Sequence, residues 1–249
     1  MSIEEKYQEF KQKYSHLEAE ELMAEANEEF GIYGKLAVFS SFGAYSALLL
    51  DMISRVNNNL PILFLETGKH FYETLQYVDD IKDELQLNNI VMLKPDPKIL
   101  AHADENGDLW QSNVDRCCWI RKVEPLERHM QEMEYEAVIT GRRSYQTPER
   151  SEMGKIELDD KENIRINPLA FWSKDKIKEE FNNRNLTQHP LVDQGYPSIG
   201  CAPCTKVVRP GEDERSGRWA HVVDLQPEKE QKTECGIHLS KEETQDWVI

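Results

Sequence analysis

The stretch from residue 36 to residue 46 reads LAVFSSFGAYS, and it decides the fold. Its first four residues are apolar and predict a short buried strand, while the apolar residues 47–53 indicate that a helix follows. The turn between them offers hydroxyls and a glycine, namely Ser40, Ser41, Gly43 and Ser46. Backbone N–H groups and the helix dipole at such a turn favour an oxyanion. The turn therefore predicts an anion-binding site, with an ordinary strand-to-helix connection as the alternative.

Further apolar runs alternate with helical patterns along the chain. Strands are predicted at 61–65, 90–93 and 137–140, and helices at 71–85 and 173–185, the last with Ser173 as its N-cap. This alternation is typical of an α/β fold with an open, mainly parallel sheet and helices on both faces. Ligands bind such sheets at the carboxyl ends of the strands.

The two ends of the chain have a different character. The acidic residues 1–30 carry apolar side chains at helical spacing, which predicts one or two amphipathic helices used for packing or oligomer contacts. Residues 144–166 are polar and predict a loop or flap. From residue 195 onward, Gly, Pro and charged residues predict a cysteine-bearing loop and an irregular tail.

Composition limits the partners of the chain. Its 249 residues, 39% of them hydrophobic and 31% charged, suit one large α/β domain with a tail. No apolar stretch approaches the roughly 20 residues that span a bilayer, and the acidic start lacks the pattern of a secretion signal. The net charge of −16 disfavours nucleic acid and acidic membranes, so an anionic ligand needs a local basic pocket. We expect a cytoplasmic protein with reduced thiols.

Five cysteines fall into two pairs and a single. The pairs are Cys117 with Cys118 and Cys201 with Cys204, and Cys235 follows alone in TECGIHL. Four thiolates hold structural zinc or an iron–sulfur cluster. Spacing alone leaves zinc, a cluster and unrelated buried thiols open. Cys235 lies close to a His and a Gly in the sequence, which suits a nucleophile.

Basic residues gather around these cysteines and after the predicted strand 137–140. They are Arg116, Arg121, Lys122, Arg142, Arg143, Arg150, Lys206, Arg209, Arg215 and Arg218. In so acidic a chain, this clustering favours an anion pocket over a solvated charged surface.

Two resemblances follow from these motifs. The turn at 41–46 resembles the S-G-G-x-D-S pyrophosphate loop of the adenine-nucleotide α-hydrolases, with Phe42 in place of the first Gly and Tyr45 in place of the acidic residue. The lost negative charge argues against binding magnesium pyrophosphate and against simple ATP cleavage. The segments CCWIRKVEPL, TGRRSYQT, GYPSIGCAPCT, GEDERSGRW and KTECGIHL resemble the iron–sulfur branch of the assimilatory adenylyl-sulfate reductases, within the phosphoadenylyl-sulfate reductase family.

The resemblance implies an activity and a cofactor. The activity is reduction of adenylyl sulfate to sulfite and AMP in sulfate assimilation, with thioredoxin or a similar dithiol as reductant. The ligands of a 4Fe-4S cluster would be Cys117, Cys118, Cys201 and Cys204. Cys235 would be the nucleophile that forms an S-sulfocysteine, with His238 as a candidate auxiliary residue.

The resemblance also implies a substrate site and a division of the chain. The substrate would contact Ser40, Ser41, Gly43, Ser46, Leu65, Thr67, Lys122, Arg142, Arg143, Arg215 and Arg218. Residues 1–30 would form a helical extension, 31–210 the nucleotide- and cluster-binding domain, and 211–249 a mobile tail that carries Cys235.

Several alternatives stay open at this point. The substrate could carry a 3′-phosphate, as phosphoadenylyl sulfate does, or both nucleotides could serve. A zinc-stabilised nucleotide-activating enzyme and a non-catalytic redox sensor built on a cluster are alternatives of other classes. A homo-oligomer is also open.

Overall fold

The computed structural model describes residues 1–225, 232, 234, 236–237 and 241–247. The chain forms two compact units, which are described separately here. The first consists of Met1–Phe64, Tyr77–Val91 and Met133–Gln188, and the second of Leu65–Gln76, Met92–Glu132 and His189–Ile249. No helix in the described part of the chain is long and apolar enough to cross a membrane.

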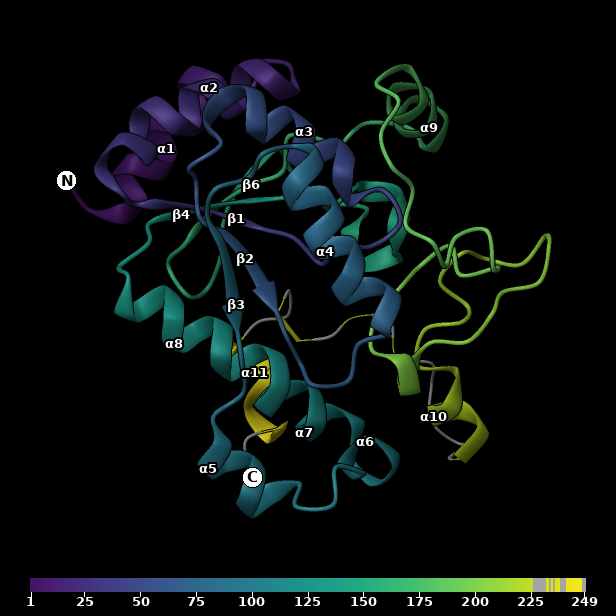
Figure 1. Ribbon diagram of the computed structural model, residues 1–249. Helices are drawn as coiled ribbons and strands as arrows, with labels where there is room; N and C mark the ends of the chain where they lie inside the picture. Colours follow the sequence, from purple (N-terminus) through teal and green to yellow (C-terminus); the bar gives the residue numbers. More distant parts are fainter. Residues whose placement is uncertain (226–231, 233, 235, 238–240, 248–249) are drawn as a thin grey trace. The chain divides into compact units, whose positions relative to one another are not determined.

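The first unit is built on a six-stranded sheet with the order β3-β2-β1-β4-β6-β5 (Figure 1). The strands are β1 Leu36–Phe39, β2 Ile62–Leu65, β3 Ile90–Leu93, β4 Ala137–Thr140, β5 Ile156–Leu158 and β6 Ile164–Ile166. β1 pairs in parallel with β2 and β4, and β4 with β6, whereas β5 runs antiparallel to β6. The mainly parallel sheet confirms the predicted fold class.

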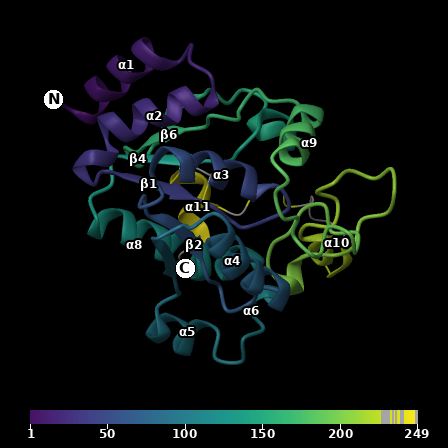
Figure 2. The ribbon, with the colours of Figure 1, turned by 45° about the horizontal axis from the view of Figure 1, so that its top comes forward.

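Helices of the first unit surround this sheet (Figures 1 and 2). They are α1 Ile3–Tyr14, α2 Ala19–Glu29, α3 Ser46–Asn57 and α9 Lys174–Asn183, with α4 Tyr72–Glu84 shared between the units. Helix α9 packs against α3. A capping box starts α1, since Glu5 N–H donates to Ser2 Oγ and Ser2 N–H to the Glu5 carboxylate. Ser173 caps α9 as predicted, accepting from Lys176 N–H at 3.1 Å.

The prediction of a loop at 144–166 is wrong over its second half. This segment supplies β5 and β6, and Ile164 and Ile166 are fully buried. Each strand has three residues with a charged one at its centre, which hides the apolar pattern. Arg165 of β6 is neutralised by Asp159 at 2.8 Å, so its charge is compatible with a buried strand.

The second unit consists of short helices and irregular chain. Its helices are α5 Pro97–Ala103, α6 Leu109–Ser112, α7 Val114–Cys118, α8 Glu124–Glu132, α10 Ala220–Leu225 and α11 Lys241–Thr244. A π-helical turn, Trp119–Val123, connects α7 to α8 and will be called the π turn. Its inner residues Ile120 to Val123 are buried, including Arg121 and Lys122. Inserted π turns occur often at functional sites.

Candidate functional site

The turn after β1 has a strained backbone that is fixed by packing. Phe42 has φ +46°, a left-handed value that normally favours glycine, and its side chain is fully buried. Its ring meets Phe64 edge-on with centroids 5.4 Å apart, and its N–H donates to Ser40 Oγ at 3.2 Å. The residue that replaces the first loop glycine therefore keeps the glycine-like conformation, at a cost of about 1–3 kcal/mol.

The rest of this turn also departs from a nucleotide-hydrolysing loop. Ser46 Oγ donates to Gly43 O at 2.8 Å as α3 begins, which ties the turn to the helix. Tyr45 packs edge-on against Phe181 of α9, with centroids 5.5 Å apart. An aromatic contact thus occupies the position where the related loops carry an acidic residue. Ser41 is exposed and Gly43 half-buried, so both remain accessible to a ligand.

Arg142, predicted to bind an anion, is already paired within the first unit. Its guanidinium donates to Glu157 at 2.6 Å and to Asn167 Oδ1 at 3.3 Å, and the side chain is buried. Burial lowers the Arg142 pKa to about 10, and the charge of Arg165 adds to that shift. Arg143 lies next to it, with its N–H on Gln146.

The second unit brings both cysteine pairs together. Cys117 and Cys118 lie at the end of α7, and Cys201 and Cys204 flank a 3-10 turn. All four thiols are buried and none forms a disulfide. Burial raises the Cys117 pKa to about 12, and the nearby Cys118 and Cys201 raise it further. Burial and the charges of the other three thiols likewise raise the Cys204 pKa. The four thiols are thus near enough for their charges to act on one another.

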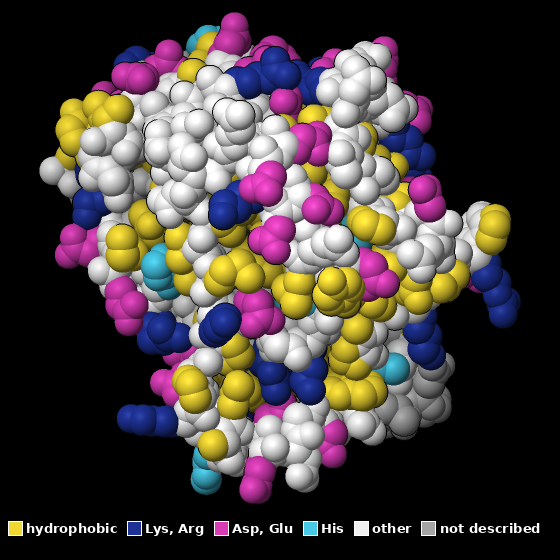
Figure 3. Space-filling model, viewed as in Figure 1, with side chains coloured by type: hydrophobic (Ala, Val, Ile, Leu, Met, Phe, Trp, Pro, Cys, Tyr) yellow, Lys and Arg dark blue, Asp and Glu magenta, His cyan; other side chains and the backbone are white. Residues whose placement is uncertain are grey.

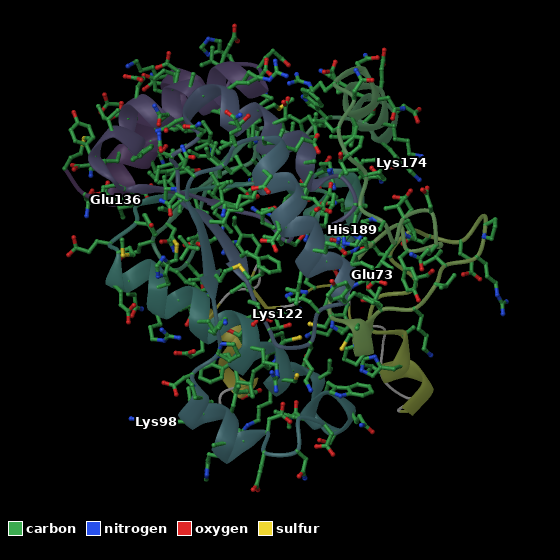
Figure 4. All side chains as sticks on the ribbon, viewed as in Figure 1. Glu73, Lys98, Lys122, Glu136, Lys174 and His189 are labelled. Carbon is green, nitrogen blue, oxygen red and sulfur yellow. The ribbon has the colours of Figure 1, made fainter. Side chains whose placement is uncertain are left out.

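Cys201 differs from its neighbours because basic groups face it. Burial acts to raise its pKa, but the Lys122 ammonium, the Thr67 hydroxyl and the Arg218 guanidinium together lower it. Thr67 Oγ1 lies 3.4 Å from Cys201 Sγ, and Lys122 extends from the π turn (Figure 4). Three predicted substrate residues therefore converge on one predicted cluster ligand.

Other predicted residues of the second unit have defined positions. Leu65 O faces His70 Nε2 at 2.7 Å, and the charges of Lys122 and Arg218 help burial to lower the His70 pKa. Arg218 donates to Ile199 O at 3.2 Å and stacks over Trp219 with 4.5 Å to the ring centroid. Arg215 is half-buried, and its N–H donates to Asp213. Cys235 and His238 lie outside the described residues.

The donor set was tested against two metal groups. As placed, no group of three or more His, Cys, Asp or Glu side chains in the described part of the chain could hold a metal ion. A single zinc requires four sulfurs about 2.3 Å from one centre. A polynuclear cluster supplies its own bridging atoms, so its ligands stand further apart. Four buried thiols are a ligand set for structural zinc and for a 4Fe-4S cluster, so the chemistry of the donor set fits either group.

Sequence reasoning missed an ion pair beneath this site. Arg121 forms a buried ion pair with Asp104 and donates to Thr67 O at 2.6 Å. It connects the π turn with the chain that follows β2. Asp104 precedes the cysteines in an unremarkable acidic segment, and no local pattern marks it. Trp219 was also missed: it is buried and packs with Cys201 and Cys204.

The sheet order and the strained turn define a class, the α/β proteins with an adenine-nucleotide α-hydrolase-like fold. A Candida glabrata FMN adenylyltransferase structure shares this fold, with a TM-score of 0.55 over 81% of this chain and 63% of that chain at 16% identity. A structure of phosphoadenylyl-sulfate reductase from Candida auris, in a phosphate complex, has a TM-score of 0.64 and 29% identity, covering 78% of this chain and 91% of that one.

Related sequences define the family within this fold class. The phosphoadenosine phosphosulfate reductase domain profile matches residues 35–207. A protein of Chelativorans sp. (strain BNC1) named adenosine 5′-phosphosulfate reductase is 45% identical over 227 residues, covering 91% of this chain and 88% of the relative. One of the same name from Mesorhizobium japonicum is also 45% identical, with 91% and 85% coverage. The chain belongs to the phosphoadenosine phosphosulfate reductase family and is an oxidoreductase, which confirms the predicted resemblance.

Proposed function

We propose that this chain reduces adenylyl sulfate to sulfite and AMP in sulfate assimilation. The single observation that carries this proposal is the set of four buried, free thiols in the second unit, together with buried Lys122 and Arg218 and with Thr67 Oγ1 3.4 Å from Cys201 Sγ. A nucleotide hydrolase has no use for such a thiol site, whereas the relatives named adenosine 5′-phosphosulfate reductase agree with it. On this proposal, Cys117, Cys118, Cys201 and Cys204 would hold a 4Fe-4S cluster.

The chemistry proceeds through Cys235. Its thiolate attacks the sulfur of the sulfuryl group, forming an S–S bond while the S–O bond to AMP breaks and AMP leaves with the electron pair. A thiolate of thioredoxin, or of a similar dithiol protein, then attacks the Cys235 sulfur and expels sulfite. The second thiol of the dithiol resolves the mixed disulfide and returns Cys235 to its reduced form. Both electrons come from the dithiol.

The residues of the chain would bind and orient the substrate for this attack. In the first unit, the turn at Ser40, Ser41, Gly43 and Ser46 would donate hydrogen bonds from N–H and hydroxyl groups to a phosphate oxygen. In the first unit, Arg142 and Arg143 would add positive charge for an anion. In the second unit, Lys122, Arg215 and Arg218 would attract the sulfuryl oxygens, with Leu65 and Thr67 along the nucleotide. A cluster held by Cys117, Cys118, Cys201 and Cys204 would supply local charge to this site and would not need to change its oxidation state.

A covalent adduct tests the proposal. Incubation with adenylyl sulfate and no dithiol should add one sulfonate group to Cys235, detected by mass spectrometry of the tryptic peptide. The Cys235→Ser variant should form no adduct. An adduct that persists in this variant, or no adduct on the wild type, would contradict the mechanism.

Substrate choice requires a separate measurement. The family profile and the solved Candida auris relative are named for phosphoadenosine phosphosulfate, which carries the extra 3′-phosphate. Single-turnover sulfite release with both nucleotides in competition should favour adenylyl sulfate. Equal use of both would indicate a dual-substrate enzyme, and preference for the 3′-phosphorylated form would reverse the assignment.

Metal analysis separates the remaining alternatives. Iron with acid-labile sulfide would exclude the zinc-stabilised nucleotide-activating enzyme. Turnover that depends on Cys235 would exclude the redox sensor. Sulfite release driven by thioredoxin, and its absence without any dithiol, would identify the kind of reductant.

A further inference from the structure

Lys232 anchors the C-terminal segment to the helix that carries the first cysteine pair. Its side chain is 11% exposed, and its ammonium forms an ion pair with Asp115 of α7. Asp115 lies two residues before Cys117. An ion pair with one partner this buried has to be well matched, because burying the lysine alone would be costly.

The same lysine contacts two tryptophan rings. Its Nζ lies 3.9 Å from the centroid of Trp247 and 5.9 Å from that of Trp219. Trp219 packs with Cys201 and Cys204. Lys232 is therefore tied to elements of both cysteine pairs, through Asp115 on one side and Trp219 on the other. A desolvated cation over an aromatic face is attracted by the negative face of the ring.

Gly236 provides the second anchor. Its φ of +81° is a left-handed value. A Cβ at this position would lie 2.3 Å from Cζ3 of Trp247 and 3.0 Å from Cγ2 of Val123 in the π turn. Only a residue without a side chain lets the Trp247 ring and the π turn approach the backbone so closely. Glu234 and Ile237, on either side, are buried.

We propose that Trp247 and Lys232 are positioning residues for the nucleophile Cys235. Together with Asp115, Trp219 and Gly236 they form what we call the tail latch, which holds the chain on both sides of residue 235 in sequence. In the sequence, the anchors lie three residues before and one residue after Cys235. The inference rests on the proposed function, because it gives Cys235 the role of nucleophile.

Two rates measured on the iron-loaded full chain test the tail latch. The first is alkylation of Cys235 by iodoacetamide without nucleotide, followed on the Cys235 peptide. The second is formation of the Cys235 sulfonate at saturating adenylyl sulfate. We expect Lys232→Ala and Trp247→Ala to speed the first and slow the second, each by about five- to thirtyfold, since released contacts of 1–2 kcal/mol correspond to that range.

Matched variants distinguish a loss of positioning from a general loss of folding. Lys98→Ala removes an exposed lysine from α5 of the same unit and should leave both rates unchanged (Figure 4). Lys232→Arg and Trp247→Phe keep the charge and the ring, and should recover most of the wild-type behaviour. If Lys232→Ala fails to retain iron, the two rates measured on Trp247→Ala test the tail latch instead, because Trp247 is distant in sequence from the four cysteines of the two pairs.

The two proposals fail differently. If wild-type protein forms no sulfonate, the proposed function is overturned, while alkylation still reports whether the contacts hold the segment. If the sulfonate forms at the same rate in wild type, Lys232→Ala and Trp247→Ala, the tail latch is overturned as a positioning device. Faster alkylation with unchanged sulfonate formation also overturns it.

Discussion

Lys122 places a positive charge inside a buried thiol site. The side chain is 9% exposed and faces Cys201, whose pKa it helps to lower. We expect Lys122→Ala to reduce kcat/KM by about 10- to 150-fold, the equivalent of one charge-assisted hydrogen bond of 1.5–3 kcal/mol. Iron content and the urea midpoint should change little by comparison.

Lys122→Arg serves as the control for charge without lysine geometry, and it should regain part of the activity. Loss of iron in proportion to the loss of activity would contradict this prediction and assign Lys122 a structural role.

Single residues show where sequence reasoning about the site reached its limit. The identity of the thiol pairs could be recognised from motifs, but their convergence depends on the chain path between residues 118 and 201. Asp104 and Trp219 carry no local signal, because their roles come from contacts with Arg121 and with Cys201 and Cys204. Arg142 stays a predicted anion-binding residue, and its hydrogen bond to Glu157 could not be foreseen because Glu157 lies on a strand that the sequence did not reveal.

At the scale of elements, the segment between the second cysteine pair and Trp219 doubles back on itself. Thr205 and Arg218 form an isolated antiparallel bridge, and Lys206 N–H donates to Gly217 O at 2.9 Å. A Cβ on Gly217 would lie 2.2 Å from Lys206 O, which is a backbone atom that cannot rotate away. Gly217 therefore permits the close approach that orders Arg218 beside Cys201.

Gly217→Ala should open this pairing. We expect unfolding free energy, measured by urea denaturation, to fall by about 1–3 kcal/mol, together with a loss of activity as Arg218 moves. Gly141→Ala is the matched control, since its Cβ would meet Leu49 at an ordinary 3.5 Å. Similar stability for both variants would show that the loop relaxes without cost.

Element prediction succeeded where an apolar run had polar limits. β1, β3 and β4 begin and end at the predicted residues, since each is a four-residue run bounded by polar or turn residues. β5 and β6 were not predicted because Glu157 and Arg165 stand at the centre of three-residue strands and interrupt the apolar pattern. These charged residues can lie in strands because the folded chain pairs Glu157 with Arg142 and Arg165 with Asp159. These two short strands are thus specified by their pairing more than by their sequence pattern.

At the scale of the whole molecule, surface charge is mixed as well as abundant. Figure 3 shows acidic side chains spread over the viewed face with Lys and Arg between them, and no continuous basic area appears on that face. With a net charge of −16, this agrees with the expectation that basic groups important for an anion lie in local, buried positions. Lys122 and Arg218 have that property.

Stability should depend on pH through His189. This residue is fully buried, its Nδ1 accepts from Leu191 N–H at 3.2 Å, and its Nε2 faces the Thr74 hydroxyl at 3.1 Å (Figure 4). Burial lowers the His189 pKa to about 4, against an opposing effect of Glu73. Between pH 6.5 and 4 the unfolded chain binds a proton at this histidine that the folded chain does not bind. The free energy of unfolding is therefore at its full value above pH 6.5 and falls as the pH drops towards 4.

The expected loss is up to about 3 kcal/mol across that window. Urea denaturation of wild type and His189→Gln at several pH values should show a smaller acid loss in the variant. His16→Gln, which alters an exposed histidine, should follow wild type. Parallel pH curves for wild type and His189→Gln would contradict the assignment.

The contact between Trp247 and Gly236 has a practical consequence for anyone who prepares this protein. An affinity handle fused after residue 249 would follow that indole by only two residues and could pull it away from the glycine backbone. The opposite terminus is the better place, because Met1 is 71% exposed and the cap at Ser2 is complete without it. Purified material carrying a C-terminal handle would then underreport the native turnover rate.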